Sequence, residues 1–240
     1  MGTLVGISSP ESLAEDGLRA AVAALHEIDR VFSTWDITSP MSRLRSGAAT
    51  LQELEGPDAE VITAVLERCA LARELTGGAF DPWSLPGGVD PTGLVKGWAA
   101  GRAMDALEAG GAKVVQVNAG GDIVVRGQPE GRPWRVGIRH PEQPQALCAI
   151  IEVHASIATS GNYERPGQLI DPKNGCATST ALSATVTGPA IDLADALATG
   201  LAVGGRTVLE AIDRLEGYEA HLITNAGRHY ATPGMAFAAV

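Results

Sequence analysis

Residues 77–98 read GGAFDPWSLPGGVDPTGLVKGW, and the interpretation of the whole chain starts from this stretch. Its opening pair, Gly77-Gly78, predicts the end of a preceding helix, because glycine adopts the left-handed conformations that close helices. Asp81, a turn rich in Pro and Gly, and Asp90 follow, and Lys96 stands where another helix opens. Exposed backbone N–H groups beside fixed charges suit a phosphate ligand. Read alone, the stretch is equally consistent with two turns that flank a helix.

Helical patterns surround this stretch. Apolar residues recur at helical spacing over residues 11–32 and 58–75, and similar patterns cover 95–110 and 192–203. Asp58 stands where the N-cap of the second helix is expected.

Strand patterns fill most of the remaining chain. They cover residues 1–8, 113–127, 134–139, 147–153 and 181–188, and a terminal hairpin is centred on 225–227. The pair Gly120-Gly121 predicts a tight hairpin, and residues 156–163, SIATSGNY, are predicted to form a polar loop. Because strands and helices mix without strict alternation, we expect an α+β fold in one domain, 1–240, rather than a doubly wound sheet.

The composition excludes several classes of partner. The formal net charge of −10 argues against nucleic acid and anionic membranes, which need basic patches. An acidic protein that binds an anionic cofactor must supply local cations. The three cysteines, Cys69, Cys148 and Cys176, are widely spaced and are expected to be reduced and mostly buried. We find no signal peptide and no apolar run near the length of a membrane span, so the cytoplasm is the expected compartment.

Two features carry possible chemistry. Asp195 and Thr199 are four residues apart, so they share a helix face and offer the hard oxygen ligands that Mg²⁺ prefers. A buried Asp with a nearby donor and a Thr bonded to its own helix would give the same pattern. Trp35 follows a helix end, where it either covers the edge of the core or stacks on an aromatic ligand. The five histidines lack zinc spacing, and GxSxG, Walker A and GxGxxG motifs are absent.

In combination, the motifs resemble the ApbE family, the FAD:protein FMN transferases. The ordered set is MGT (1–3), FSTW (32–35), GGAFDP (77–82), VDPTGLVKG (89–97), NAGGD (118–122), ATSGNY (158–163), IDPKNG (170–175) and ADALAT (194–199). The resemblance extends from Met1 to about Gly204. It implies mixed, mainly antiparallel sheets with helices, forming two packed lobes around a flavin cleft. It also implies an enzyme that moves FMN from FAD onto a Ser or Thr hydroxyl of an acceptor flavoprotein and releases AMP, with Mg²⁺ on the pyrophosphate.

The resemblance also implies the site residues. Those expected to contact FAD are Met1, Trp35 (where the family usually has Tyr), Ala79, Phe80, Asp81, Asp90, Lys96 and Leu169. Asp195 and Thr199 would hold Mg²⁺ together with the backbone carbonyl of Gly93.

The chain departs from the family pattern at the proposed base. Gln168 stands where the family usually has a His that assists deprotonation of the acceptor hydroxyl. A Gln amide orients a hydroxyl but does not take its proton at neutral pH, and loss of a general base costs roughly 10²–10⁴ in rate. A short WSLPGG turn also replaces a longer insert, which leaves the site more open. FAD pyrophosphatase activity and FAD binding without catalysis therefore remain alternatives, and whether His154 or Tyr163 replaces the base stays open.

Overall fold

The computed structural model describes residues 2–161, 167, 169–178 and 180–238. Two of the predicted site residues, Met1 and Gln168, lie outside this part of the chain.

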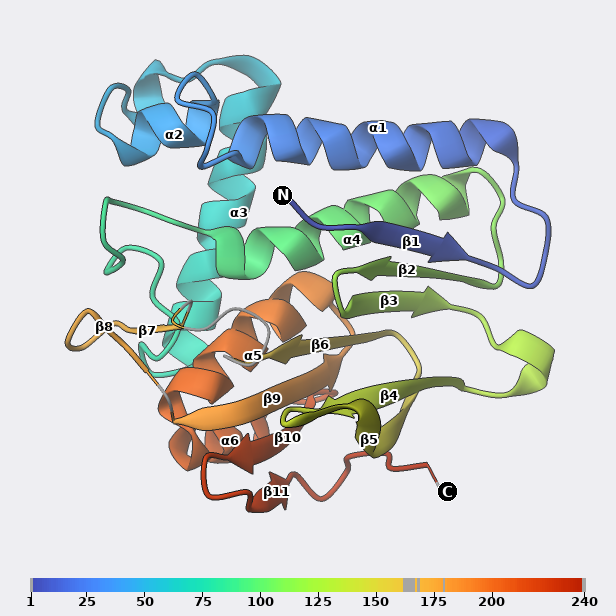
Figure 1. Cartoon of the computed structure of the whole chain (residues 1–240). Helices are drawn as coiled ribbons and strands as arrows, with labels where there is room; N and C mark the ends of the chain where they lie inside the picture. Colours follow the sequence, from blue (N-terminus) through green and yellow to red (C-terminus); the bar gives the residue numbers. More distant parts are fainter. Residues whose placement is uncertain (1, 162–166, 168, 179, 239–240) are drawn as a thin grey trace.

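A seven-stranded sheet runs through the molecule (Figure 1). Its order is β1-β2-β3-β6-β9-β10-β11, and every neighbouring pair is antiparallel. The bounds are β1 Val5–Ser8, β2 Val115–Ala119, β3 Asp122–Arg126, β6 Ser156–Ser160, β9 Ala181–Gly188, β10 Glu219–Thr224 and β11 His229–Ala231. Two further antiparallel pairs are β4 Trp134–His140 with β5 Gln143–Val153, and β7 Ile170–Asp171 with β8 Cys176–Ala177.

Helices α4 and α5 pack against the sheet, and α1 lies over α4 (Figure 1). The helix bounds are α1 Glu15–Phe32, α2 Pro40–Arg45, α3 Gly56–Leu75, α4 Thr92–Ala109, α5 Ile191–Gly204 and α6 Arg206–Ile212. Short 3₁₀ turns cover Leu51–Glu53 and Pro129–Gly131. Among the helices of the described segments, none is long and apolar enough to cross a membrane.

Both faces of the sheet are covered, as the strand β3 shows. Val124 joins the main core cluster with the helices, whereas Ile123 and Val125 pack with Ile138 and Ile151 of the β4–β5 hairpin. Successive side chains of a strand point to opposite faces, so an uninterrupted apolar run such as Ile123–Val125 suits a strand that is buried on both sides. The α+β fold with mainly antiparallel sheets is therefore confirmed.

The predicted loop at residues 156–163 is wrong for its first five residues. Ser156–Ser160 form β6, which pairs with β3 and β9 in the middle of the large sheet. Their hydroxyls find partners inside the fold: Ser156 Oγ donates to the Gly188 carbonyl at 2.6 Å, and Thr159 Oγ1 lies 2.9 Å from Thr185 Oγ1. A run of small polar residues predicts a loop when only the sequence is considered. Hydroxyl groups are nevertheless tolerated in a buried strand when they have hydrogen-bond partners.

Three predicted helix starts are displaced. The helix at 11–32 begins at Glu15, after a local turn in which the Glu11 N–H donates to Ser9 Oγ. Asp58 is not an N-cap, because Pro57 allows α3 to begin at Gly56. The helix predicted at 95–110 begins at Thr92, three residues early. The helix predicted at 192–203 and the β2–β3 hairpin lie where the patterns predict them. Helix α2 was not predicted, because the segment SPMSRLRSG (39–47) was interpreted as a polar loop.

The cysteines are free, but only one of them is buried. Burial raises the pKa of Cys69 to about 12, which keeps this thiol protonated and unreactive. Cys148 is half-buried and Cys176 is exposed, so the expectation of mostly buried cysteines is wrong.

Candidate functional site

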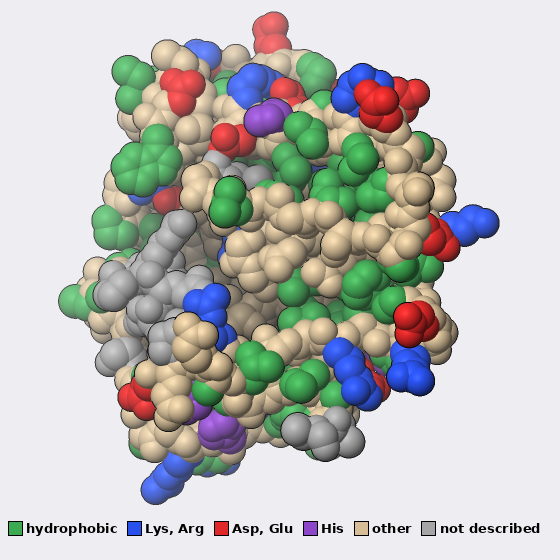
Figure 2. All heavy atoms as spheres, turned by 45° about the vertical axis from the view of Figure 1, so that its right-hand side comes forward, with side chains coloured by type: hydrophobic (Ala, Val, Ile, Leu, Met, Phe, Trp, Pro, Cys, Tyr) green, Lys and Arg blue, Asp and Glu red, His purple; other side chains and the backbone are tan. Residues whose placement is uncertain are grey.

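A cavity of about 510 Å³ gathers segments that are far apart in the sequence. Its walls come from the end of α1, residues 79–96, the β2–β3 hairpin, the end of β6, residues 169–172 and helix α5. All the predicted site residues within the described segments line it: Trp35, Ala79, Phe80, Asp81, Asp90, Gly93, Lys96, Leu169, Asp195 and Thr199. In the space-filling view the surface is hollowed, and charges of both signs are interspersed around it (Figure 2).

The floor of this cavity depends on the close contact of α4 with α5. A side chain at Gly97 would place its Cβ 2.6 Å from the Ile191 carbonyl oxygen, so glycine is required for the two helices to meet. At this contact the Gly97 N–H donates to Asp195 Oδ2 at 2.9 Å. The KGW sequence thus places the Asp195 carboxylate, on α5, against the backbone of α4.

A second buried carboxylate, Asp122 at the start of β3, lies beside Asp195. We call Asp122 and Asp195 the floor aspartates; they are 0% and 2% exposed. The Lys96 ammonium lies 2.7 Å from Asp122 Oδ2, and the Asp122 and Asp195 carboxyl groups interact with each other. Burial raises the pKa of Asp195 well above its usual range, and the Asp122 charge raises it further, against the opposing influence of Lys96. Burial likewise raises the pKa of Asp122, partly offset by Lys96. The floor therefore places two carboxyl groups beside one ammonium.

Asp122 was not among the predicted site residues, since the NAGGD motif was interpreted as a hairpin and counted as a family motif without a role for its Asp. That prediction is correct, because Ala119 pairs with Asp122 across a two-residue turn. The overlooked indication was the position of the acid at the head of an apolar strand, DIVVR. A carboxylate there is buried, and a buried carboxylate needs a cationic or hydrogen-bonding partner.

Oxygen donors surround Asp195 on the cavity side. Thr199 follows one turn later on α5, and its Oγ1 lies 3.1 Å from Ser160 Oγ. Gly93 lies against Thr199, since a Cβ added to Gly93 would stand 3.4 Å from Thr199 Oγ1. Asp195, Thr199 and the Gly93 backbone thus converge on one part of the cavity wall.

This donor set fits Mg²⁺ rather than a transition metal. Across the described segments, no group of three or more His, Cys, Asp or Glu side chains is arranged to hold a metal ion. Mg²⁺ does not need such a group, because it is commonly bound through one or two carboxylates and takes its other ligands from water and phosphate. One carboxylate, one hydroxyl and one backbone carbonyl meet that requirement.

Two other acids, Asp81 and Asp90, line the cavity at the two ends of the short turn between them, and we call them the rim aspartates. Each precedes a proline, and each uses one carboxylate oxygen to accept the N–H two residues on: Trp83 at 3.0 Å and Thr92 at 3.1 Å. The other oxygen of Asp81 accepts from Arg73 Nε at 2.6 Å, and that of Asp90 accepts from Arg45. Burial alone would raise the pKa of Asp81, but hydrogen bonds from Arg73, Ser84 and Trp83 outweigh it and lower the pKa.

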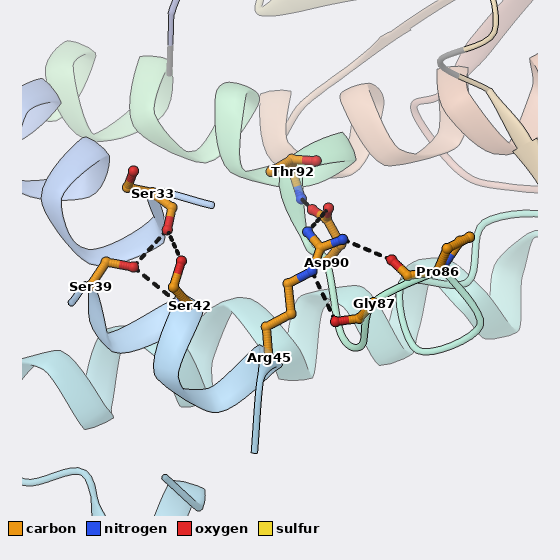
Figure 3. A network of polar contacts seen from close by, with 8 residues as sticks. All are labelled: Ser33, Ser39, Ser42, Arg45, Pro86, Gly87, Asp90 and Thr92. Carbon is orange, nitrogen blue, oxygen red and sulfur yellow. Dashed lines mark hydrogen bonds and ion pairs between the residues drawn. The ribbon is translucent and has the colours of Figure 1, made fainter. Parts of the chain in front are cut away.

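Arg45 fastens the short turn between the rim aspartates (Figure 3). Besides Asp90, its guanidinium donates to the carbonyl of Pro86 at 2.8 Å and to that of Gly87 at 3.2 Å. Gly88 has φ of +103°, and a Cβ there would overlap the Arg45 carbonyl oxygen. Arg45 is the last residue of α2, and Ser39 caps the start of this helix. Both Ser39 and Ser42 donate to the Ser33 carbonyl (Figure 3). The turn that was expected to leave the site open is thus tied to the end of α1.

Trp35 does not cover the core. Its side chain lines the cavity but is 92% exposed, which rules out the structural alternative weighed for it. Ala79, Phe80 and Leu169 supply apolar wall, and Phe80 and Leu169 are buried. His154, one of the two residues that could replace the missing base, is exposed between β5 and β6 and is not among the described residues that line the cavity. Tyr163 lies outside the described residues.

Comparison with known proteins adds a family and a set of relatives. The sequence model described as "ApbE family" matches residues 1–87 and 84–222. A protein named FAD:protein FMN transferase from Klebsiella pneumoniae (strain 342) is 31% identical over 215 residues, covering 82% of this chain and 61% of that protein. Proteins of the same name from Rhodobacter capsulatus and Escherichia coli (strain K12) are 35% and 33% identical, covering 58% and 60% of this chain and 29% and 44% of theirs. The chain thus spans less than two thirds of the length of these curated relatives.

Solved structures show the same fold. A flavin transferase ApbE from Vibrio cholerae superposes with a TM-score of 0.82 at 23% identity, covering 97% of this chain and 94% of that one. An ApbE protein from Thermotoga maritima gives a TM-score of 0.81 at 23% identity, with the same coverage of each chain. At this level of identity the likeness concerns the fold.

Proposed function

Because the chain belongs to the ApbE family, we propose that it is an FAD:protein FMN transferase that acts on a Ser or Thr hydroxyl of an acceptor flavoprotein. One observation carries the proposal: Lys96, Asp195 and Thr199 converge in one cavity, which apolar side chains such as Phe80 and Leu169 also line. Because the protein has a net charge of −10, a pyrophosphate can bind only where cations are supplied locally. Lys96 and a metal ion held by Asp195 and Thr199 would supply them in this cavity.

In the proposed reaction, the acceptor hydroxyl oxygen attacks the phosphorus on the FMN side of the FAD pyrophosphate. A new P–O bond joins FMN to the acceptor, the bond from that phosphorus to the bridging oxygen breaks, and AMP leaves with the bridging oxygen. The hydroxyl proton passes to a base or to solvent. Phosphoryl transfer of this kind relies on positioning and on stabilisation of charge rather than on covalent chemistry of the protein.

The described residues supply both requirements. Lys96 places a positive charge in the cavity wall, and Trp35 offers an exposed aromatic face on which a flavin or adenine ring stacks. Ala79, Phe80 and Leu169 exclude water from the apolar side. The rim aspartates hold the turn that closes the entrance, and contacts of Asp81, Asp90 and Met1 with FAD belong to the same proposal.

We assign the Mg²⁺ ligands to Asp195, Thr199 and the Gly93 carbonyl. When bound, the ion would neutralise charge on the pyrophosphate oxygens. Asp195 is held for this task by the Gly97 N–H, which fixes one of its oxygens at 2.9 Å.

Gln168 favours a second candidate function with the same site. If no base takes the proton of the acceptor hydroxyl, water competes as the nucleophile, and the products are free FMN and AMP. That activity is an FAD pyrophosphatase. Binding of FAD without cleavage is the third possibility. The carboxylate, hydroxyl and lysine that cleavage requires are all present in the cavity, which argues against binding without cleavage.

The test is incubation of the purified protein with FAD and Mg²⁺, with and without a flavin-acceptor domain, followed by intact-mass analysis and nucleotide chromatography. The proposal predicts an acceptor heavier by one FMN, together with AMP, and no reaction in EDTA. Free FMN and AMP without a labelled acceptor would replace it by the pyrophosphatase, and FAD that stays bound and intact would replace it by a flavin-binding protein.

A further inference from the structure

We propose that Asp122 is a positioning residue that holds the Lys96 ammonium away from Asp195, so that the Asp195 carboxylate stays available to a divalent cation. The inference rests on the metal site of the proposed function. Asp122 is fully buried and is not among the residues that line the cavity, whereas Lys96 and Asp195 both line it. Asp122 therefore lies behind the two groups and contacts both.

Two consecutive residues of α4 each bind a different floor aspartate. The Lys96 ammonium pairs with Asp122 Oδ2 at 2.7 Å, and the Gly97 N–H pairs with Asp195 Oδ2 at 2.9 Å. The backbone N–H carries no net charge, so the ammonium is paired with Asp122 rather than with Asp195. The backbone N–H of Thr159 donates weakly to Asp122 Oδ1, at 3.4 Å, which helps to fix the carboxylate.

Removing the Asp122 charge would leave one carboxylate within reach of the lysine. The Lys side chain is flexible and its ammonium has three donors, so it can turn from one neighbouring carboxylate to another. A half-buried ammonium favours a nearby carboxylate, and Asp195, which interacts with both Asp122 and Lys96, is a second carboxylate beside it. An ion pair between Lys96 and Asp195 would then compete with a divalent cation for the same oxygens.

The experiment measures binding of Mn²⁺, as a probe for Mg²⁺, to the full chain without FAD, by electron paramagnetic resonance or calorimetry. We expect Asp122→Asn to weaken Mn²⁺ binding about tenfold or more, the usual range for a residue that supports a metal ligand from behind. The matched control is Asp192→Asn, on the helix that carries Asp195, α5. Asp192 is also a buried carboxylate, but it is paired with Arg68 Nε at 2.6 Å and is not among the cavity-lining residues. The control should bind Mn²⁺ within twofold of the wild type.

A second pair of variants identifies the cause. Lys96→Met should bind Mn²⁺ at least as tightly as the wild type, because no ammonium competes for Asp195. Adding Asp122→Asn to Lys96→Met should then change the affinity less than twofold. A tenfold loss in the double variant would overturn the inference, since Asp122 would be acting without Lys96. Weaker binding in Lys96→Met alone would overturn it as well, and this variant keeps the test valid if Asp122→Asn does not fold.

The outcomes separate the inference from the proposed function. Equal Mn²⁺ affinity of Asp122→Asn and Asp192→Asn would overturn the role of Asp122 and leave the transferase proposal standing. If the variants show the expected Mn²⁺ affinities but the wild type transfers no FMN, the role of Asp122 stands and the transferase proposal is overturned. A wild-type chain that binds no Mn²⁺ would overturn the inference together with the metal assignment.

Discussion

The rim and the floor of one cavity use the same amino acid in two ways. In each rim aspartate, both carboxylate oxygens are bonded within the protein. One oxygen accepts the N–H of the residue two positions later, and the other pairs with an arginine. The floor aspartates are buried beside one shared lysine, and their oxygens are not committed to arginines. Rim acids therefore shape the entrance, and floor acids keep capacity for a cation.

The comparison changes how the two Asp-Pro motifs are understood. The resemblance assigned Asp81 and Asp90 to FAD contact, and both do line the cavity. Their local bonds show a further task that sequence matching did not reveal, which is to fasten the turn between them. Arg73 and Arg45, which do this, come from different parts of the chain.

The largest expected effect comes from removing a floor oxygen. Asp195→Ala should lower FMN transfer about a thousandfold, the order of effect when several kcal/mol of transition-state stabilisation by a metal are lost. Steady-state release of AMP with saturating Mg²⁺ measures it. A matched rim variant, Asp81→Asn, should lose far less. Comparable losses in both variants would remove the distinction between rim and floor.

Restoring a general base at position 168 should have the next largest effect. Gln168→His is expected to raise the rate of FMN transfer up to about a hundredfold, within the usual range for general-base catalysis. The increase should grow with pH as the imidazole loses its proton. Rates for the two proteins measured from pH 6 to 9 test this, and an unchanged rate throughout that range would show that the missing base does not limit transfer.

At the rim, a smaller and different effect is expected. Arg45→Ala removes the donors that hold Pro86, Gly87 and Asp90, so the KM for FAD should rise about tenfold while kcat changes less than about twofold. Arg43→Ala is the control, since Arg43 is exposed two residues earlier on α2. A fall in kcat with an unchanged KM would mean that Arg45 acts on the chemistry instead.

Trp35→Ala should weaken FAD binding about fivefold, which corresponds to an aromatic contact of about 1 kcal/mol. Because the side chain is 92% exposed, the free energy of unfolding should change by less than about 0.5 kcal/mol. Flavin fluorescence and urea denaturation measure the two quantities. A large loss of stability with unchanged FAD affinity would return Trp35 to a structural role.

The smallest effect expected is a difference in the pH dependence of stability. The folded-state pKa of Asp195 is raised, so its contribution to stability is present below the unfolded value of about 3.9 and is lost as pH rises through the folded pKa. The pKa of Asp81 is lowered, so its contribution is present above that value and is lost as pH falls. Urea denaturation of the wild type, Asp195→Asn and Asp81→Asn from pH 3 to 8 should show the two variants differing from the wild type at opposite ends. The same pH profile in Asp195→Asn and the wild type would contradict the account of the floor.

Local patterns were sufficient for much of the fold. The glycine pair after α3, the Gly120-Gly121 hairpin and the apolar spacing of α5 each follow from neighbouring residues, and each was predicted. β6 was not, because Ser156 and Thr159 become suitable strand residues only when the partners on β9 are known. The helix starts shifted for similar reasons, as Pro57 shows for α3.

The residues of the candidate site also fall into those that local sequence motifs predicted and those that only the folded structure identifies. Motif matching selected residues that the fold brings into one cavity, although the chain between Trp35 and Asp195 contains most of the sheet. It did not find Asp122, Arg45 or Arg73, whose importance lies in contacts over a distance in sequence or across a turn. Asp122 is recognised by the ammonium and carboxyl that it contacts, and neither is near it in the sequence.

The most direct test of the difference between rim and floor is the position of the cation. Crystals grown with Mn²⁺ and FAD should give one strong anomalous peak in the cavity, within coordination distance of Asp195, Thr199 and the Gly93 carbonyl oxygen. A peak at the rim beside Asp81 or Asp90, or FAD bound in the cavity with no peak at the floor, would contradict the account.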